Sequence, residues 1–229
     1  MKTSTLITLS GMIGSGKTTL SKVISERFGL DLYEEPVDSP ILKQFYLASE
    51  EEQEINRYPF LLQLDFLASR YHILQTASDK DVVAVIDRSL QEDYHFAKVN
   101  ADIGNIRPIE FEAYERVFNT MMDEVGITIH KTPLVLVYLE GSFETILHRI
   151  QTRGRDFEIG DELVDYYYRL WSGYKEWIDN YEGGRVYRIN IDEVDVLNKS
   201  EDCERVLKEI EEIVNEQVKD DAKKIHLLP

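Results

Sequence analysis

Residues 11–19 read Gly-Met-Ile-Gly-Ser-Gly-Lys-Thr-Thr and directly follow the apolar run 6–9. This is the pattern G-x-x-x-x-G-K-[ST] between a strand and a helix, and it constrains the fold more than any other feature of the chain. Its glycines allow successive backbone N–H groups to surround phosphate oxygens, and the helix that follows adds its positive end. Lys17 can reach the β- and γ-phosphates, and the hydroxyl of Thr18 is placed to bind Mg²⁺. The residues of this loop expected to bind a nucleoside triphosphate are Gly11, Gly14, Ser15, Gly16, Lys17, Thr18 and Thr19.

The composition limits the kinds of molecule that the protein is expected to bind. The formal net charge of −17 argues against a nucleic-acid partner, because no strongly basic stretch offsets it. No apolar run reaches the length of a membrane span, so no membrane partner is expected. Cys203 is the only cysteine, and no signal peptide is recognised at the N-terminus, so a reducing, cytoplasmic setting is expected. An acidic protein that handles an anionic nucleotide must concentrate its cations at the site.

Apolar strands alternate with helical patterns along the whole chain. Strands are predicted at 5–10, 31–35, 82–87, 134–139 and 185–191, and helices at 17–28, 53–77, 90–100, 108–125, 142–152, 161–180 and 200–218. The third and fourth strands are nearly continuous aliphatic runs, which is typical of parallel strands buried on both faces. We therefore predict an α/β fold: a doubly wound, five-stranded parallel sheet of the P-loop NTPase type flanked by helices. One kinase domain spans residues 1–229, with an Arg-rich lid at about 149–160 and a loosely held tail at about 219–229.

Ligands of such sheets gather at the carboxyl ends of the strands. Glu34 and Glu35 end the second predicted strand, where a carboxylate could accept a proton from an attacking hydroxyl; the alternative is a surface residue at a strand end. Asp87 ends the third strand and suits a Mg²⁺ interaction, and Arg88 adds a cation beside the transferring phosphoryl group. A structural ion pair between Asp87 and Arg88 is the alternative.

Three arginines lie close together in the otherwise acidic chain. Arg149, Arg153 and Arg155 fall within seven positions, with Gly154 as a flexible break. A mobile lid that closes over ATP would use such arginines to stabilise charge and exclude water. A solvated basic helix end is the alternative.

A fourth candidate segment lies on the long helix predicted at 53–77. Gln63, Phe66 and Arg70 share about two turns of one face. A buried amide and a buried guanidinium need partners, and a flat heteroaromatic base would satisfy the amide. The alternative is that the amide of Gln63 and the guanidinium of Arg70 reach solvent or bond to another part of the protein.

These segments together resemble the deoxyribonucleoside kinase family, and in particular its bacterial deoxyadenosine/deoxyguanosine kinase branch. The resemblance spans about residues 5–180 and includes Glu35-Pro36-Val37, Phe60 to Gln63 with Arg70, Asp87 to Asp93, and Arg149 to Glu158. It implies ATP-dependent phosphorylation of the 5′-hydroxyl of a purine deoxynucleoside, with Mg²⁺ as cofactor, in nucleotide salvage. Deoxycytidine is a further substrate of such enzymes.

The resemblance also implies a role for individual residues. Glu35 matches the general base, and Arg88 matches the arginine that holds the 5′-hydroxyl and the base carboxylate. Gln63 matches the amide that pairs with the nucleobase, and Arg70 with Asp93 matches a charged pair at the floor of the base pocket. The 3′-hydroxyl is assigned to Glu158 and Tyr46, the metal to Thr18 and Asp87, and the lid to Arg149, Arg153 and Arg155.

Two other readings of the chain remain open from the sequence. One is a nucleoside monophosphate kinase of the thymidylate kinase type, which would not need Glu35 as a base. The other is a P-loop nucleotide switch without kinase activity. The resemblance implies a homodimer, and the apolar stripe Tyr114, Val117, Phe118 and Met121 could form its interface or could be ordinary core.

Overall fold

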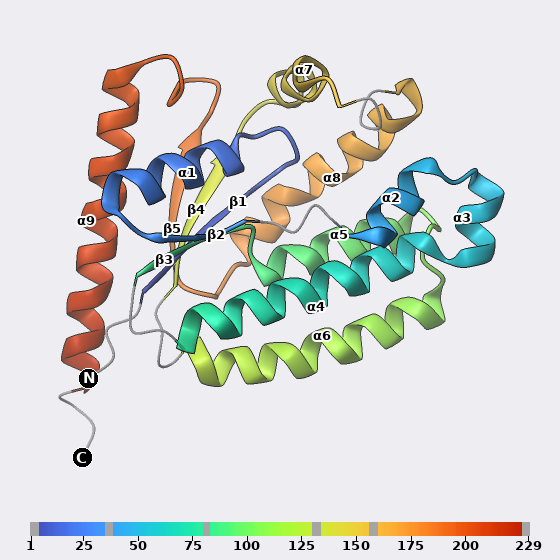
Figure 1. Cartoon of the computed structure of the whole chain (residues 1–229), viewed down its shortest axis with the longest axis horizontal. Helices are drawn as coiled ribbons and strands as arrows, with labels where there is room; N and C mark the ends of the chain where they lie inside the picture. Colours follow the sequence, from blue (N-terminus) through green and yellow to red (C-terminus); the bar gives the residue numbers. More distant parts are fainter. Residues whose placement is uncertain (1–4, 35–38, 80–82, 130–133, 156–159, 226–229) are drawn as a thin grey trace.

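The computed structural model describes residues 5–34, 39–79, 83–129, 134–155 and 160–225. Its centre is a parallel sheet of five strands in the order β2-β3-β1-β4-β5 (Figure 1). The strands are β1 (Leu6–Gly11), β2 (Asp31–Tyr33), β3 (Ala84–Asp87), β4 (Leu134–Glu140) and β5 (Arg185–Asn190). The predicted doubly wound five-stranded α/β sheet is confirmed.

The three central strands are buried because helices cover both faces of the sheet. Every residue of β1 and β3 is buried, as are the first six residues of β4. In register, Leu6 lies between Ala84 and Leu134, and Leu9 lies beside Asp87. The carboxyl ends of β1 and β3 therefore lie side by side, which brings residues from separate parts of the sequence to one edge.

The helices form a layer on each side of the sheet, and α6 packs outside α4 and α5 (Figure 1). Helix α1 contacts β1 and β3, α9 contacts β4 and β5, and α4 contacts β3 from the other side. The helices are α1 (Lys17–Phe28), α2 (Pro40–Leu47), α3 (Glu50–Asn56), α4 (Tyr58–Asp79), α5 (Leu90–Asp102), α6 (Pro108–Ile129), α7 (Phe143–Arg153), α8 (Asp161–Asp179) and α9 (Ser200–Ile225).

The single helix predicted at 53–77 is wrong at its start, where the structure has two helices. Helix α3 begins at a capping box in which Ser49 and Glu52 bond to each other's backbone N–H groups. It ends at Asn56, and the next residue, Arg57, has a left-handed backbone with a φ of 57°. The guanidinium of Arg57 donates to both carboxylate oxygens of Glu110 on α6, at 2.6 Å each. This tertiary anchor fixes the break, and the local sequence does not reveal it.

Helix α2 was not predicted. Ser39 caps it by accepting bonds from the N–H groups of Ile41 and Leu42, and Pro40 occupies its first position. Helix α9 runs seven residues beyond the predicted end, from 218 to Ile225. No helix among the described residues is long and apolar enough to cross a membrane.

The apolar stripe of α6 faces mainly inward. Tyr114 is completely buried, and Phe118 and Met121 pack against the cluster formed by α4, α5 and α6. Val117 is 40% exposed. Tyr114, Phe118 and Met121 therefore pack as core, which was one of the two interpretations of this stripe, whereas Val117 is exposed.

Candidate active site

The loop after β1 has the backbone that a phosphate cradle requires. Gly11, Gly14 and Gly16 have φ values of 138°, 82° and 100°, a region that residues with side chains rarely adopt. A Cβ at Gly11 would lie 2.4 Å from the carbonyl oxygen of Leu139, so β1 could not approach β4 as closely. Ser15 N–H donates to Met12 O at 3.1 Å and closes the turn. The loop is thus shaped by backbone conformation, in agreement with the motif.

The N-terminus of α1 presents its backbone N–H groups without a side-chain cap, because the residue before it is Gly16. Lys17 follows directly and is buried. Its Nζ donates to the carbonyl oxygens of Gly11 and Met12 at 2.7 and 3.0 Å. The ammonium group is therefore held over the loop, where it adds positive charge.

Thr18 and Asp87 meet at the end of β3. The hydroxyl of Thr18 donates to Oδ2 of Asp87 at 2.6 Å, and Asp87 is buried. A hydroxyl and a carboxylate are hard oxygen ligands of the kind that Mg²⁺ prefers. Within the described part of the chain, no group of three or more His, Cys, Asp or Glu side chains is placed to hold a metal ion. This pair fits an ion held by one or two side chains plus substrate phosphates, as Mg²⁺ commonly is.

Arg88 follows Asp87 and has a strained backbone. Its φ is 84°, which is unusual for a residue with a side chain. Its N–H donates to Leu9 O at 2.9 Å, and its guanidinium lies 4.6 Å from the centre of the Phe96 ring. Nη1 donates to Oε1 of Glu92 at 3.1 Å. The buried guanidinium is held from several sides.

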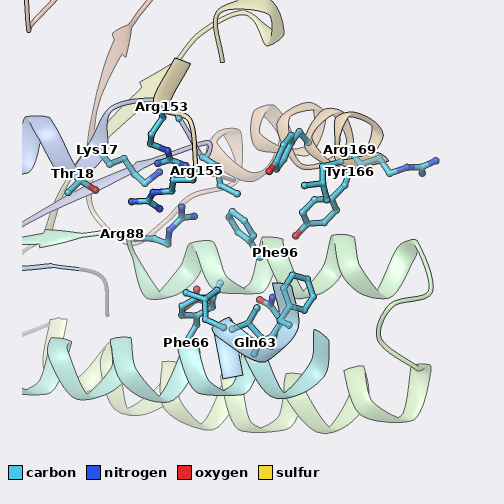
Figure 2. A pocket seen from close by; sticks show the side chains of 18 of the residues that line it. Lys17, Thr18, Gln63, Phe66, Arg88, Phe96, Arg153, Arg155, Tyr166 and Arg169 are labelled. Carbon is cyan, nitrogen blue, oxygen red and sulfur yellow. The ribbon is translucent and has the colours of Figure 1, made fainter. Parts of the chain in front are cut away.

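One cavity of about 1840 Å³ contains most of the predicted site residues (Figure 2). Lys17, Arg88, Arg153 and Arg155 gather at one end, and Gln63 and Phe66 lie at the other. Small-molecule pockets typically measure about 300–1,000 Å³. The cavity is therefore large enough for two ligands, with the phosphate cradle at one end.

The far end of the cavity is lined by buried polar groups. Arg70 and Asp93 form an ion pair with side chains 4% and 2% exposed. Gln63 is 5% exposed, and its side chain makes no hydrogen bond to another residue that the structure describes. Phe66 lies beside them, with the Arg70 guanidinium 4.9 Å from its ring centre. A flat ligand with donors and acceptors at its edge suits these surroundings.

The three lid arginines differ in their surroundings. Arg149 is half-buried and donates to Ser15 O at 3.1 Å and to Ile191 O at 3.3 Å. It is therefore anchored to the phosphate loop and is not an unpaired cation on a free helix face. Arg153 and Arg155 are exposed and line the cavity, and Gly154 ends α7 with a φ of 67°.

Three predicted residues cannot be placed at side-chain level. Glu35 and Glu158 lie outside the described residues, and of Tyr46 only its position in α2 is described. Glu34, the residue before Glu35, lines the cavity and pairs with Lys22 at 2.7 Å. The carboxyl end of β2 therefore lies at the edge of the cavity.

Four residues of this region were missed from the sequence. Phe96 and Tyr166 line the cavity, whereas Glu92 and Tyr174 lie behind it. Aromatic residues at helical spacing usually indicate core, so nothing in the sequence separated Phe96 or Tyr166 from their neighbours. The hydroxyl of Tyr166 accepts a bond from Asn100 at 3.1 Å, and burial raises its pKa.

The order of the strands, the glycine loop and the lysine at the start of α1 define a P-loop NTPase-type kinase fold. Residues 7–215 match the family model described as deoxynucleoside kinase, and the chain belongs to that family. It is 38% identical over 210 residues to a deoxyguanosine kinase of Lactobacillus johnsonii, covering 90% of this chain and 91% of that protein. It is 37% identical over 216 residues to a deoxyadenosine kinase of Lactobacillus acidophilus, covering 92% and 97%.

The fold is also similar to solved structures. A deoxyadenosine kinase from M. mycoides with bound dATP superimposes with a TM-score of 0.72 and 27% sequence identity, covering 90% of this chain and 98% of that one. The same enzyme with bound dCTP gives a TM-score of 0.71. The chain is therefore a deoxynucleoside kinase, and the alternatives of a thymidylate-type kinase and a switch without kinase activity are set aside.

Proposed function

We propose that this deoxynucleoside kinase transfers the γ-phosphoryl group of ATP to the 5′-hydroxyl of a purine deoxynucleoside, deoxyadenosine ahead of deoxyguanosine, with deoxycytidine as a further substrate. One observation carries the proposal: the buried Gln63, Arg70 and Asp93 line the same cavity as Lys17. A phosphate cradle and a polar pocket for a flat ring at opposite ends of one cavity suit a donor and an acceptor that bind together. The names of the relatives support a purine substrate.

At the donor end, Lys17 and the loop amides hold the phosphates, and Arg153 and Arg155 approach the γ-phosphoryl group from the lid. Thr18 and Asp87 hold Mg²⁺, which neutralises charge on the phosphates when bound. Glu35 accepts the proton of the 5′-hydroxyl while the oxygen of that hydroxyl forms a bond to the γ-phosphorus. The bond between that phosphorus and the β–γ bridging oxygen breaks, and ADP leaves.

At the acceptor end, the amide of Gln63 pairs with the edge of the base. Tyr46 and Glu158 bind the 3′-hydroxyl of the sugar. The ion pair of Arg70 and Asp93 offers donors and acceptors to exocyclic groups and occupies the space that a thymine methyl group needs. A pocket built for hydrogen bonds discriminates strongly, since the wrong base leaves buried polar groups unpaired.

Transfer of label from γ-³²P-ATP to the four deoxynucleosides and adenosine tests the proposal. Label is expected in dAMP and dGMP, with less in dCMP and very little in dTMP. Omission of divalent metal should abolish transfer, because Mg²⁺ is part of the proposed donor site. Preferential labelling of thymidine, or the same rate in excess EDTA, would contradict it.

We also propose a homodimer that packs through long helices. Leu61 on α4 is 37% exposed, and Ile109 and Val117 on α6 are 67% and 40% exposed. Helices α4 and α6 pack together, so these side chains belong to one helical layer (Figure 1). Sedimentation equilibrium of the full chain should give twice the mass of 26.7 kDa.

A further inference from the structure

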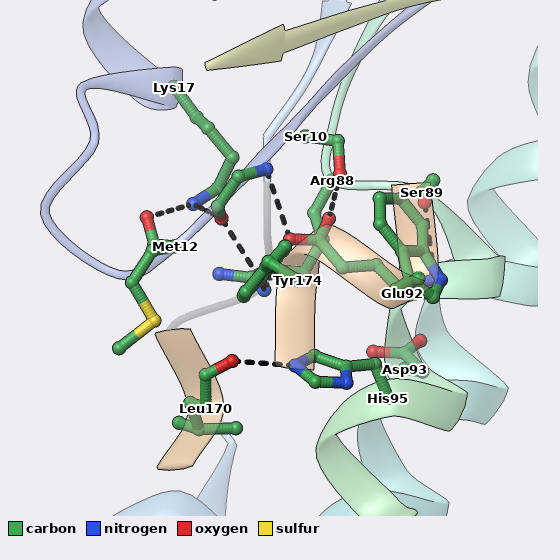
Figure 3. Close-up of polar contacts among 12 residues, drawn as sticks. Ser10, Met12, Lys17, Arg88, Ser89, Glu92, Asp93, His95, Leu170 and Tyr174 are labelled. Atoms are coloured by element: carbon green, nitrogen blue, oxygen red, sulfur yellow. Dashed lines mark hydrogen bonds and ion pairs between the residues drawn. The ribbon is translucent and has the colours of Figure 1, made fainter. Parts of the chain in front are cut away.

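Glu92 is a buried carboxylate behind the cavity, and the roles proposed above do not use it. It is completely buried in the first turn of α5 and is not among the described residues that line the cavity. Its Oε2 accepts from the hydroxyl of Ser10 at 2.7 Å. Its Oε1 accepts from the N–H of Gly11 at 3.1 Å, from Arg88 at 3.1 Å and from the hydroxyl of Tyr174 (Figure 3). These donors come from β1, from the residue after β3 and from α8.

An acidic residue in the first turn of a helix usually caps it or interacts with its dipole at the surface. Glu92 is instead fully desolvated, which is costly for a carboxylate without partners. Ser89 already caps α5 by accepting a bond from the N–H of Glu92 at 3.2 Å. The carboxylate is therefore free to bond across to the phosphate loop.

The contacts of Glu92 lead to two of the cations at the phosphate end, Lys17 and Arg88. It accepts from the N–H of Gly11, while Lys17 donates to the carbonyl of the same residue at 2.7 Å. It also accepts from Arg88, whose left-handed backbone needs support from its surroundings. Although burial alone raises the pKa of Glu92, the charges of Arg88 and Lys17 and the bonds from Tyr174 and Ser10 lower it below its ordinary value. Glu92 is thus an anion at neutral pH.

Tyr174 completes the arrangement as a donor. Burial and the charge of Glu92 raise its pKa well above the ordinary value, so its hydroxyl keeps its proton. The hydroxyl lies within hydrogen-bonding distance of both Glu92 and the carbonyl of Gly11, at 3.1 Å from the latter. The hydroxyl has one proton, which cannot serve both acceptors. Because Lys17 already donates to the carbonyl of Gly11, the Tyr174 proton is assigned to Glu92.

We propose that Glu92 is a positioning residue for phosphoryl transfer: it fixes the guanidinium of Arg88 and the first peptide of the phosphate loop from behind, and its charge balances Arg88 and Lys17. The proposal rests on the function proposed above and on the role that the family resemblance implies for Arg88, which is to hold the 5′-hydroxyl and the base carboxylate. It predicts opposite effects on ATP binding and on phosphoryl transfer. Without the negative charge of Glu92, the cations attract ATP more strongly. Without its hydrogen bonds, Arg88 and the phosphate loop are less well placed, and phosphoryl transfer is slower.

Glu92→Gln tests this, since it keeps the shape and removes the charge. The expected result is a kcat at least ~10-fold lower with a Kd for ATP that is unchanged or smaller, as for an interaction realised in the transition state. The matched control is Glu209→Gln on α9, where a half-buried carboxylate also accepts from a tyrosine, Tyr187. The control should leave both values as in the wild type.

Two outcomes would overturn the proposal. A wild-type kcat in Glu92→Gln would remove any positioning role. A Kd for ATP that rises in step with the fall in kcat would show that Glu92 only maintains the fold of the loop. Wild-type enzyme is assayed in parallel with deoxyadenosine, so an inactive wild type would instead contradict the proposed function.

A second variant covers the case in which Glu92→Gln does not fold. Tyr174→Phe removes one donor to Glu92 Oε1 and keeps the ring in its apolar surroundings. The expected result is a smaller fall in kcat, by about 3-fold, with an unchanged Kd for ATP, because the remaining donors still hold the carboxylate. An unchanged kcat in this variant would contradict the proposal.

Discussion

Arg70 on α4 and Asp93 on α5 form an ion pair that is almost completely removed from solvent, with side chains 4% and 2% exposed. Two consecutive helices, with β3 between them in the chain, contribute one charge each. Neither charge is stable in the core without the other. The pair also lines the cavity near Gln63. It is therefore expected to influence both the stability of the fold and the choice of base.

The first prediction concerns stability. Arg70→Met should lower the free energy of unfolding by about 3–5 kcal/mol, since it leaves Asp93 charged and unpaired in the core. Arg70→Met combined with Asp93→Asn should lose less than the sum of the two single losses, because it removes both charges. Urea unfolding of the four proteins measures this double-mutant cycle. Strictly additive losses would show that the pair is not coupled.

The second prediction concerns specificity and uses the same double variant. The ratio of kcat/KM for deoxyadenosine to that for thymidine should fall by about 10²-fold, because the pocket loses its charged donors and acceptors and gains room for a methyl group. Steady-state kinetics with both nucleosides at one ATP concentration gives the ratio. If the ratio stays at its wild-type value, the pair serves stability alone.

The third prediction assigns Gln63 to the base. Gln63→Leu should raise KM for deoxyadenosine at least ~10-fold, in line with the loss of one or two hydrogen bonds in a buried site, and should leave KM for ATP within twofold. The control is Gln75→Leu on the same helix, where the side chain is exposed and donates to the hydroxyl of Tyr71. A parallel rise in both KM values would indicate a general disturbance of α4.

The fourth prediction tests the general base. Glu35→Gln should fold normally and lose at least ~10²-fold in kcat, the lower range for loss of such a base. Glu34→Gln is the neighbouring control; Glu34 is half exposed and pairs with Lys22, so a much smaller effect is expected. Turnover like that of the wild type in Glu35→Gln would remove Glu35 from this role.

The sequence predicts the parts of this protein that depend on local pattern. The aliphatic runs of β3 and β4 predict buried parallel strands, and the glycine loop with Lys17 predicts the phosphate cradle. The break between α3 and α4 depends on the tertiary contact of Arg57 with Glu110, and it was missed. Glu92 was missed for the same reason: its partner Ser10 is 82 positions away, and the first turn of a helix is an ordinary place for an acid.

The fifth prediction concerns His95, whose ring fills the space next to Gly173 on α8. A Cβ at Gly173 would lie 2.4 Å from the ring, and Nε2 is 2.8 Å from Leu170 O. Burial lowers the pKa of His95, although Leu170 O and Glu92 oppose this.

The unfolded chain therefore binds a proton at His95 below about pH 6.5, while the folded protein does not until a lower pH. The free energy of unfolding should fall from about pH 6.5 toward the folded pKa, by at most ~1.4 kcal/mol per pH unit from this group. Urea unfolding between pH 7.5 and 5 should give a shallower slope for His95→Gln than for the wild type, because the variant has lost this contribution while its carboxylates still titrate. Parallel slopes for the two proteins would show that His95 has the same proton affinity in the folded and unfolded chains.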